Sequence, residues 1–314
     1  MIENKELLIP PNISLRLAPE FLEKVFQETL SHDSETGGHI YGLRHQEGNI
    51  TEFIPMLSFT PKATEEIKRQ KDECTIGGLT CKQYLEWVYL HWEKARKNFL
   101  RREPTQESYY ENCEFGFLGT WHSHPGEMPF YSLTDTAWVN ESLDYYADYL
   151  FPILVKRRPQ PRIHPQSAQF TIDHRTIIEG LFFYRTQANK KFSYFLKPTE
   201  YSLPLPQIPA APWYVEAPAL FNQEYDALVA SGFSIIPFPL FIPDNETEAQ
   251  IWLQVTHPQL PHPLFIRTPS DYHLTHHLFL ARKDPREDLQ LQINSHLKPH
   301  PFKSITEFIT NYAY

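Results

Sequence analysis

Cysteine is scarce in this sequence of 314 residues: only Cys74, Cys81 and Cys113 occur. Their odd number and the lack of a CxxC pair argue against a disulfide framework and against a zinc knuckle built from thiolates. We interpret the three residues as reduced thiols, as expected in a cytoplasmic protein.

Long apolar runs and an excess of basic residues are also missing. No stretch approaches the roughly 20 apolar residues that a membrane span needs, and the first residues, MIENKELLIPPN, hold no apolar run of signal-peptide length. Lys and Arg total 29 against 38 Asp and Glu, which gives a net charge of −9. We therefore expect a cytoplasmic protein whose partners include neither a membrane nor a nucleic acid.

The apolar patterns that are present predict helices mixed with strands. Apolar residues recur at helical intervals over residues 19–30, and Pro19 suits a first helical turn. Two short apolar runs, 40–43 and 50–57, flank a stretch with hairpin turn chemistry at 45–49. The sequence therefore predicts one helix followed by two antiparallel strands.

The middle of the chain continues this mixed pattern. Thr80 and Gln83 resemble a capping box, and the apolar stripe after them predicts a helix to about Arg102. A strand over Phe115–Trp121 should stop at His122-Ser123-His124-Pro125, because proline cannot continue a central strand. The residues that follow predict a helix over 132–146 and strands over 149–156, 168–172 and 177–184.

A dense run of prolines indicates a domain boundary. Six prolines lie from Pro198 to Pro218, a density that favours extended, weakly structured chain. We predict a first domain over residues 1–197, a linker over 198–218 and an accessory domain over 219–314.

The accessory domain should itself mix helices and strands. Its patterns predict helices over 220–229 and 305–312, the second capped by Ser304, and strands between them that include 249–256. The expected fold class is therefore α+β (mixed), with a sheet flanked by helices in the first domain and a second, smaller α+β domain.

Two histidines and an aspartate offer the donor set of a metal site. His122 and His124 are two residues apart at the end of the predicted strand, so both side chains can project to one side. Asp135 lies in the first turn of the next predicted helix. Three such N/O ligands leave a fourth position for the water that a hydrolytic zinc site activates. Two plainer interpretations are a half-buried histidine pair and a helix cap formed by Ser132 and Asp135.

Together these residues coincide with a known pattern. His-x-His-Pro, six residues and then Ser-x-x-Asp resembles the signature of the JAB/MPN (JAMM) zinc metallopeptidases; here it is His122-Ser123-His124-Pro125 followed by Ser132-Leu133-Thr134-Asp135. That family also carries an upstream glutamate in a Glu-x-x-Gly stretch, which Glu35-Thr36-Gly37-Gly38 resembles. The similarity covers roughly residues 10–195 and is closest to the prokaryotic JAB branch.

The resemblance implies a JAB/MPN-type sheet and a role for each site residue. Zinc would be held by His122, His124 and Asp135, while Glu35 would act as the general base. Ser132 would lend a hydroxyl hydrogen bond to the oxyanion, a role compatible with helix capping. The implied substrate is a ubiquitin-like protein or its conjugate, cleaved after the C-terminal glycine. Adenylating and conjugating enzymes of the same pathway are implied as further partners.

Two other functions stay open at this point. The chain could be a JAMM peptidase that acts on another protein, because residues 60–114 exceed what compact relatives have there and such insertions frame the substrate groove. It could also be a noncatalytic MPN scaffold, although the complete set of ligands and base argues against that.

The C-terminal half offers weaker signals. It loosely resembles ubiquitin-conjugating-enzyme and RWD-like domains, but no cysteine follows Cys113, so it cannot carry a thioester through cysteine. An unrelated α+β accessory domain is the plainer interpretation. Asp271, His273, His276 and His277 could in principle ligate a second metal, but surface histidines are the favoured interpretation.

Overall fold

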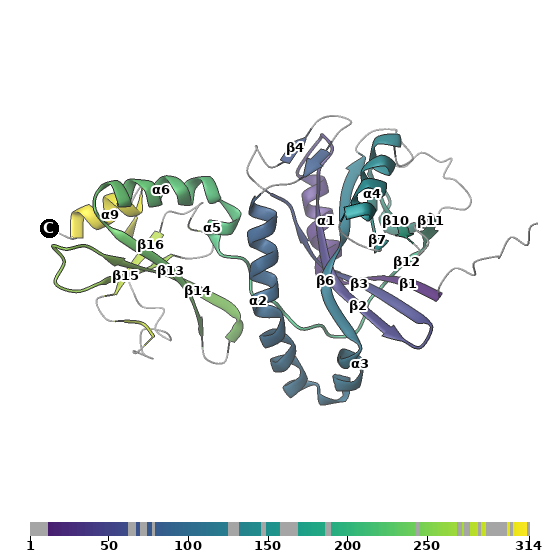
Figure 1. The fold of residues 1–314 in the computed structure, drawn as a ribbon, viewed down its shortest axis with the longest axis horizontal. Helices are drawn as coiled ribbons and strands as arrows, with labels where there is room; N and C mark the ends of the chain where they lie inside the picture. Colours follow the sequence, from purple (N-terminus) through teal and green to yellow (C-terminus); the bar gives the residue numbers. More distant parts are fainter. Residues whose placement is uncertain are drawn as a thin grey trace, which may run out of the picture. The chain divides into compact units, whose positions relative to one another are not determined.

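The chain divides into two compact units (Figure 1). The first comprises Met1–Cys81 with Leu100–Pro204, and the second comprises Lys82–Phe99 with Leu205–Tyr314. The computed structural model describes residues 12–61, 67–69, 74–76, 79–124, 132–145, 149–157, 169–185, 190–242, 245–268, 272, 277–281, 284–286, 300–301 and 304–312. Three of the four residues weighed for a second metal site, Asp271, His273 and His276, lie outside the described residues.

A large mixed sheet forms the centre of the first unit. Its strands follow the order β11-β10-β8-β6-β2-β3-β1-β12, and β7 and β9 also pair with β10. The pairs β1·β3, β1·β12 and β6·β8 are parallel and the others antiparallel. The strands are β1 (Asn12–Leu17), β2 (Gly37–Glu47), β3 (Ile50–Phe59), β6 (Cys113–His124), β7 (Tyr149–Leu150), β8 (Ile153–Arg157), β9 (Gln169–Asp173), β10 (Thr176–Arg185), β11 (Lys191–Leu196) and β12 (Pro198–Glu200).

Helices flank this sheet and cover its apolar side chains. Helix α1 (Pro19–Leu30) buries Phe21 and Val25 and contacts β3, while α4 (Leu133–Tyr145) buries Val139 and Leu143 against β7 and β10. A short helix, α3 (Glu107–Glu111), follows the 3-10 turn Pro104–Gln106, and β4 (Ile67–Arg69) pairs with β5 (Cys74–Ile76) as a separate ribbon. The predicted mixed α+β class is therefore confirmed.

Most predicted elements of this unit are confirmed, with differences at the ends of two strands. Helix α1 has the predicted bounds and the β2–β3 hairpin is present, but β2 is longer than the predicted 40–43 and includes residues 45–47 of the predicted turn stretch. Gly48 supplies the positive φ of 59° in the turn. Strand β6, however, continues through His124 and does not stop at Trp121. It pairs with β2 on one side and β8 on the other as far as the histidines, so the ladder extends to the residue before Pro125.

Gly42 is a position where β2 approaches β3 too closely for a side chain. A Cβ added there would lie 2.0 Å from the carbonyl oxygen of Ile54. We expect Gly42→Ala to lower the free energy of unfolding by about 1–3 kcal/mol, because the strands must separate to admit the methyl group. Urea titration measures the change, with Glu47→Ala at an exposed position of the same strand as control. An unaltered midpoint for Gly42→Ala would contradict the close pairing of β2 with β3.

The second unit is built around a smaller antiparallel sheet. Its strands follow the order β13-β14-β15-β16-β17, and helices α6 and α9 bury Leu228 and Phe308 in a core that also contains Trp213. The elements are α2 (Leu79–Arg102), α5 (Trp213–Glu216), α6 (Pro218–Ala230), β13 (Ser234–Ile242), β14 (Asn245–Thr256), β15 (Leu264–Thr268), β16 (His277–Ala281), β17 (His300–Pro301) and α9 (Ile305–Tyr312). The predicted cap of the last helix is present, since the Ser304 Oγ accepts a hydrogen bond from the Glu307 N–H at 3.0 Å.

Two features of the chain differ from what its sequence predicts. Most of α2, Lys82–Phe99, groups with the second unit, and the Trp87 indole donates a hydrogen bond to the Pro209 carbonyl at 3.1 Å. The proline-rich segment is also more structured than its composition indicates, because β12 joins the large sheet and Trp213 is fully buried. Proline lacks a backbone N–H, so it is tolerated at the edge of a sheet and at the start of a helix, where that N–H would have no partner. No helix in the described ranges is long and apolar enough to cross a membrane.

Candidate metal centre

Strand β6 presents two imidazoles on one face of the large sheet. His122 and His124 alternate with Ser123, so their side chains project to the face opposite to that of the serine. The strand lies between β2 and β8, with His122 opposite Gly37 and His124 beside Lys156. His124 is only 2% exposed. Pairing on both sides therefore fixes the backbone that carries both histidines.

The third donor comes from the start of α4, where a reciprocal cap forms. The Asp135 N–H donates to the Ser132 Oγ at 3.0 Å, and the Ser132 N–H donates to the Asp135 Oδ2 at 2.7 Å. This is the capping-box arrangement, with aspartate in place of the usual glutamate. The helix-cap interpretation is thus confirmed, and it fixes the orientation of the carboxylate that faces the histidines.

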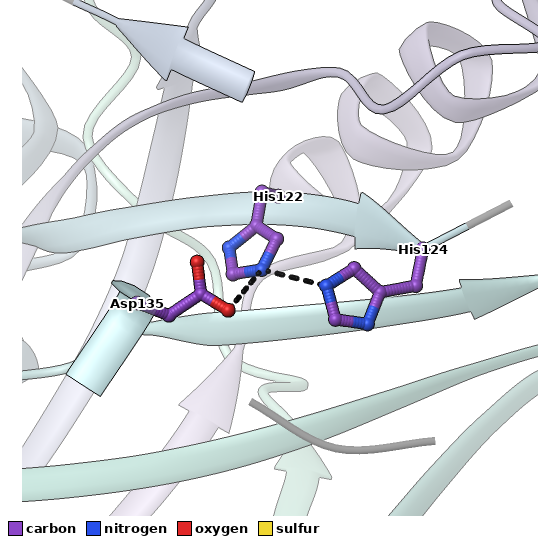
Figure 2. Close-up of side chains that lie close together, drawn as sticks. All are labelled: His122, His124 and Asp135. Carbon is purple, nitrogen blue, oxygen red and sulfur yellow. Dashed lines mark hydrogen bonds and ion pairs between the residues drawn. The ribbon is translucent and has the colours of Figure 1, made fainter. Parts of the chain in front are cut away.

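The three side chains converge on one point, as Figure 2 shows. The Nε2 atoms of His122 and His124 are 3.1 Å apart, and the His122 Nε2 lies 3.6 Å from the Asp135 Oδ2. One ligand atom from each residue lies within 4.8 Å of both others. Metal–ligand bonds of 2.0–2.1 Å in a tetrahedral zinc site separate neighbouring ligand atoms by about 3.3 Å. The donor set and its spacing therefore fit a small tetrahedral cation.

The charge state of Asp135 suits a metal ligand. Partial burial alone would raise the pKa of this carboxyl, but the hydrogen bond and charge of His122, with the bonds from Ser132, outweigh burial and hold the pKa well below its usual range. Asp135 is therefore ionised at neutral pH, and a metal ion there would meet a carboxylate anion.

Glu35 lies next to this set without belonging to it. It sits in the segment between α1 and β2, is 4% exposed, and places its Oε1 3.5 Å from the His124 Nε2. Among the described residues, the group of mutually close ligand atoms consists of His122, His124 and Asp135 only. The structure therefore brings all five predicted site residues together, with Glu35 beside the possible ligands and Ser132 bonded to one of them.

Residues that carried no functional prediction also border the site. The side chain of Lys156 projects to the same face as that of His124, and its Nζ forms a 2.6 Å ion pair with Glu179, which also accepts a hydrogen bond from Gln169. Both ends of this ion pair are buried, so the charges compensate each other close to the candidate metal centre. A lysine and a glutamate 23 positions apart on two strands give no sequence signal before the strand order is known.

His39 is a third imidazole on this face, and it is half-buried. It follows Gly37 by two positions on β2, its Nδ1 lies 3.2 Å from the Tyr41 hydroxyl, and its ring meets that of Phe117 edge-on at 5.3 Å. Burial lowers the pKa of His39 to about 4 from its ordinary value of 6.5. The folded protein therefore keeps this ring neutral at neutral pH.

The low pKa of His39 predicts acid destabilisation of the metal-free protein. Between pH 6.5 and about pH 4 the His39 imidazole is protonated in the unfolded chain but stays neutral in the folded chain. The free energy of unfolding should therefore fall as the pH is lowered through this window. Urea titrations of chelated protein at pH 7 and pH 5 measure the fall, which should be smaller in His39→Leu. His174→Leu, at an exposed site, should behave as the wild type. An equal fall in all three proteins would contradict the assignment.

Comparisons with known proteins give little further information. No family model matches the chain, and no curated protein matches it. Among solved structures, the chain is similar to the solution structure of protein DSY2949 from Desulfitobacterium hafniense, with 12% identity over 60% of this chain and 94% of that one. The TM-score of 0.30 is too low for an argument about fold or function.

Proposed function

We propose that this chain is a zinc-dependent peptidase of the JAMM type. The observation that carries the proposal is a buried carboxylate, Glu35, 3.5 Å from a histidine of a three-residue donor set that matches tetrahedral zinc. A structural zinc site is normally closed by four protein ligands, whereas three ligands with a neighbouring base are typical of hydrolytic zinc sites.

The reaction follows from the positions of the chain's own groups. Zinc, when bound, supplies a Lewis acid that acidifies water and polarises a carbonyl group. Glu35 takes the proton of the attacking water as its oxygen bonds to the carbonyl carbon, and later gives that proton to the amine that leaves as the C–N bond breaks. Ser132 Oγ already accepts from the Asp135 N–H, so its own hydrogen remains available for donation to the developing oxyanion.

The substrate we propose is a ubiquitin-like protein or its conjugate, cleaved after the C-terminal glycine. The support is the resemblance of Glu35-Thr36-Gly37-Gly38, His122-Ser123-His124-Pro125 and Ser132-Leu133-Thr134-Asp135 to the JAMM pattern. An extended glycine tail also suits a site beside a sheet, since backbone without side chains can approach closely. Adenylating and conjugating enzymes of the same pathway would be its partners, in the cytoplasm.

The second unit is consistent with an accessory role in such a pathway. Helix α6, the antiparallel strands β13 to β16 and helix α9 follow one another in an order that agrees with the loose resemblance to ubiquitin-conjugating-enzyme domains. Without a cysteine after Cys113, this unit would recognise a partner and form no thioester.

The proposal is tested by cleavage of defined substrates. Zinc-loaded protein is incubated with ubiquitin-like proteins that carry C-terminal extensions, and the products are identified by mass spectrometry. We expect one extension to be removed after the terminal glycine, and chelation to stop the reaction. Cleavage of unrelated proteins only would favour a JAMM peptidase with another substrate, and zinc binding without any cleavage would favour a noncatalytic scaffold.

A further inference from the structure

We propose that Ser123, the residue between the two histidines, is a positioning residue that holds the base Glu35 at the metal centre. This inference rests on the proposed function, because it explains what holds the proposed general base in position. Strand alternation points Ser123 to the sheet face opposite the imidazoles, and at first sight this separates it from the chemistry.

Ser123 binds the segment that carries Glu35 through both its backbone and its side chain. The Ser123 N–H donates to the Thr36 carbonyl at 2.7 Å, and the Thr36 N–H donates to the Ser123 Oγ at 3.1 Å. Both residues are fully buried, with exposures of 1% and 0%. Two reciprocal hydrogen bonds therefore join Thr36, which follows Glu35, to Ser123, which lies between the two histidines.

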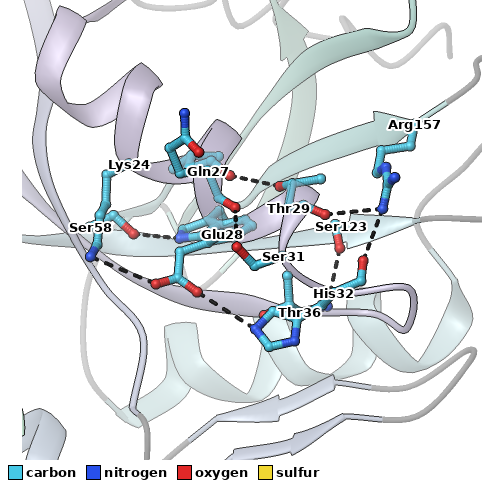
Figure 3. Close-up of polar contacts among 12 residues, drawn as sticks. Lys24, Gln27, Glu28, Thr29, Ser31, His32, Thr36, Ser58, Ser123 and Arg157 are labelled. Atoms are coloured by element: carbon cyan, nitrogen blue, oxygen red, sulfur yellow. Dashed lines mark hydrogen bonds and ion pairs between the residues drawn. The ribbon is translucent and has the colours of Figure 1, made fainter. Parts of the chain in front are cut away.

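A second contact holds the other end of the same segment, as Figure 3 shows. The guanidinium of Arg157, at the end of β8, donates to the carbonyls of His32 at 2.9 Å and Thr29 at 3.2 Å. These carbonyls lie at and just after the C-terminus of α1, where helical partners are lacking. Residues 33–36 are thus anchored at both ends, by strands β8 and β6.

The C-terminal end of β6 therefore determines the positions of both the imidazoles and the general base. The backbone of β6 places the imidazoles on one face, and through Ser123 it places Glu35 relative to His124. A base displaced by about 1 Å can lose about a hundredfold in rate, so a hydroxyl that never touches substrate can control the chemical step.

Ser123→Ala is the primary test, with Ser58→Ala as a matched control. The Ser58 hydroxyl accepts a 2.7 Å hydrogen bond from the Trp121 indole on the same strand and is 7% exposed, but it has no bond to residues 33–36 in the described chain. Each variant loses one buried hydrogen bond, with a similar expected cost in stability. We expect Ser123→Ala to keep zinc, to lower kcat about 10- to 100-fold with little change in KM, and to speed amide hydrogen exchange over residues 33–36. Ser58→Ala should leave the zinc content, kcat and the exchange rate over residues 33–36 unchanged.

A double-mutant cycle separates positioning from general loosening. If Ser123 acts through Glu35, its loss in a Glu35→Gln background should cost less than about threefold in kcat. An equal loss in both backgrounds, an unchanged kcat in Ser123→Ala, or loss of zinc would overturn the inference. Should Ser123→Ala not fold, Arg157→Leu, at the half-buried anchor, replaces it in the same cycle.

The exchange measurement also distinguishes this inference from the proposed function. If no substrate is cleaved by the wild type, the peptidase proposal fails, yet faster exchange over residues 33–36 in zinc-loaded Ser123→Ala would still show that Ser123 fixes the Glu35 segment. Unchanged exchange would overturn the positioning role even in an active enzyme.

Discussion

Replacing Glu35 with glutamine is expected to leave zinc bound and the fold intact while lowering kcat by on the order of a hundredfold or more. Glu35 is buried beside His124 and lies outside the group of ligand atoms, so the amide keeps the shape of the side chain but cannot accept the proton. Steady-state kinetics and metal analysis on the same sample measure the two effects.

The control for this variant is Glu114→Gln, an acid on β6 whose side chain is 75% exposed and pairs with Arg44. It should keep both zinc and rate. Normal cleavage by Glu35→Gln would mean that the base lies elsewhere, and loss of zinc from it would mean that Glu35 is a ligand.

Replacing His122 and His124 together with alanine is expected to reduce zinc from about one ion per chain to almost none, and to abolish cleavage. The two imidazoles supply two of the three possible ligands, and Asp135 alone would bind the ion weakly. Metal analysis after gentle purification gives the stoichiometry, and circular dichroism shows whether the fold survives.

His174→Ala is a suitable control for the double variant, because His174 is exposed in the turn between β9 and β10. It should retain the metal content of the wild type. An unchanged zinc content after the loss of both His122 and His124 would place the ion at another site.

Local patterns allowed much of the fold and of the candidate site to be predicted. Pro19 with its apolar stripe gave α1, the turn at Gly48 gave the β2–β3 hairpin, and Ser304 gave the start of α9. His122 and His124 could be assigned to one face because the side chains of a strand alternate with period two. Interactions of this kind act over a few residues and are visible in the sequence.

Contacts between distant segments could not be predicted in this way. Ser123 and Thr36 are 87 positions apart, and their pairing depends on β6 lying next to β2 in the sheet order. The grouping of most of α2 with residues 205–314 has the same origin, because the helix pattern shows which face is apolar but not what covers it. The sheet order and these contacts are set by packing across the whole unit.

The metal centre itself is tested most directly by anomalous X-ray diffraction from crystals of the purified protein, with data collected on both sides of the zinc absorption edge. The account predicts one anomalous peak about 2.0–2.2 Å from the His122 Nε2, the His124 Nε2 and an Asp135 carboxylate oxygen. A zinc peak at other residues, or none between these three in a protein that cleaves its substrate, would contradict it.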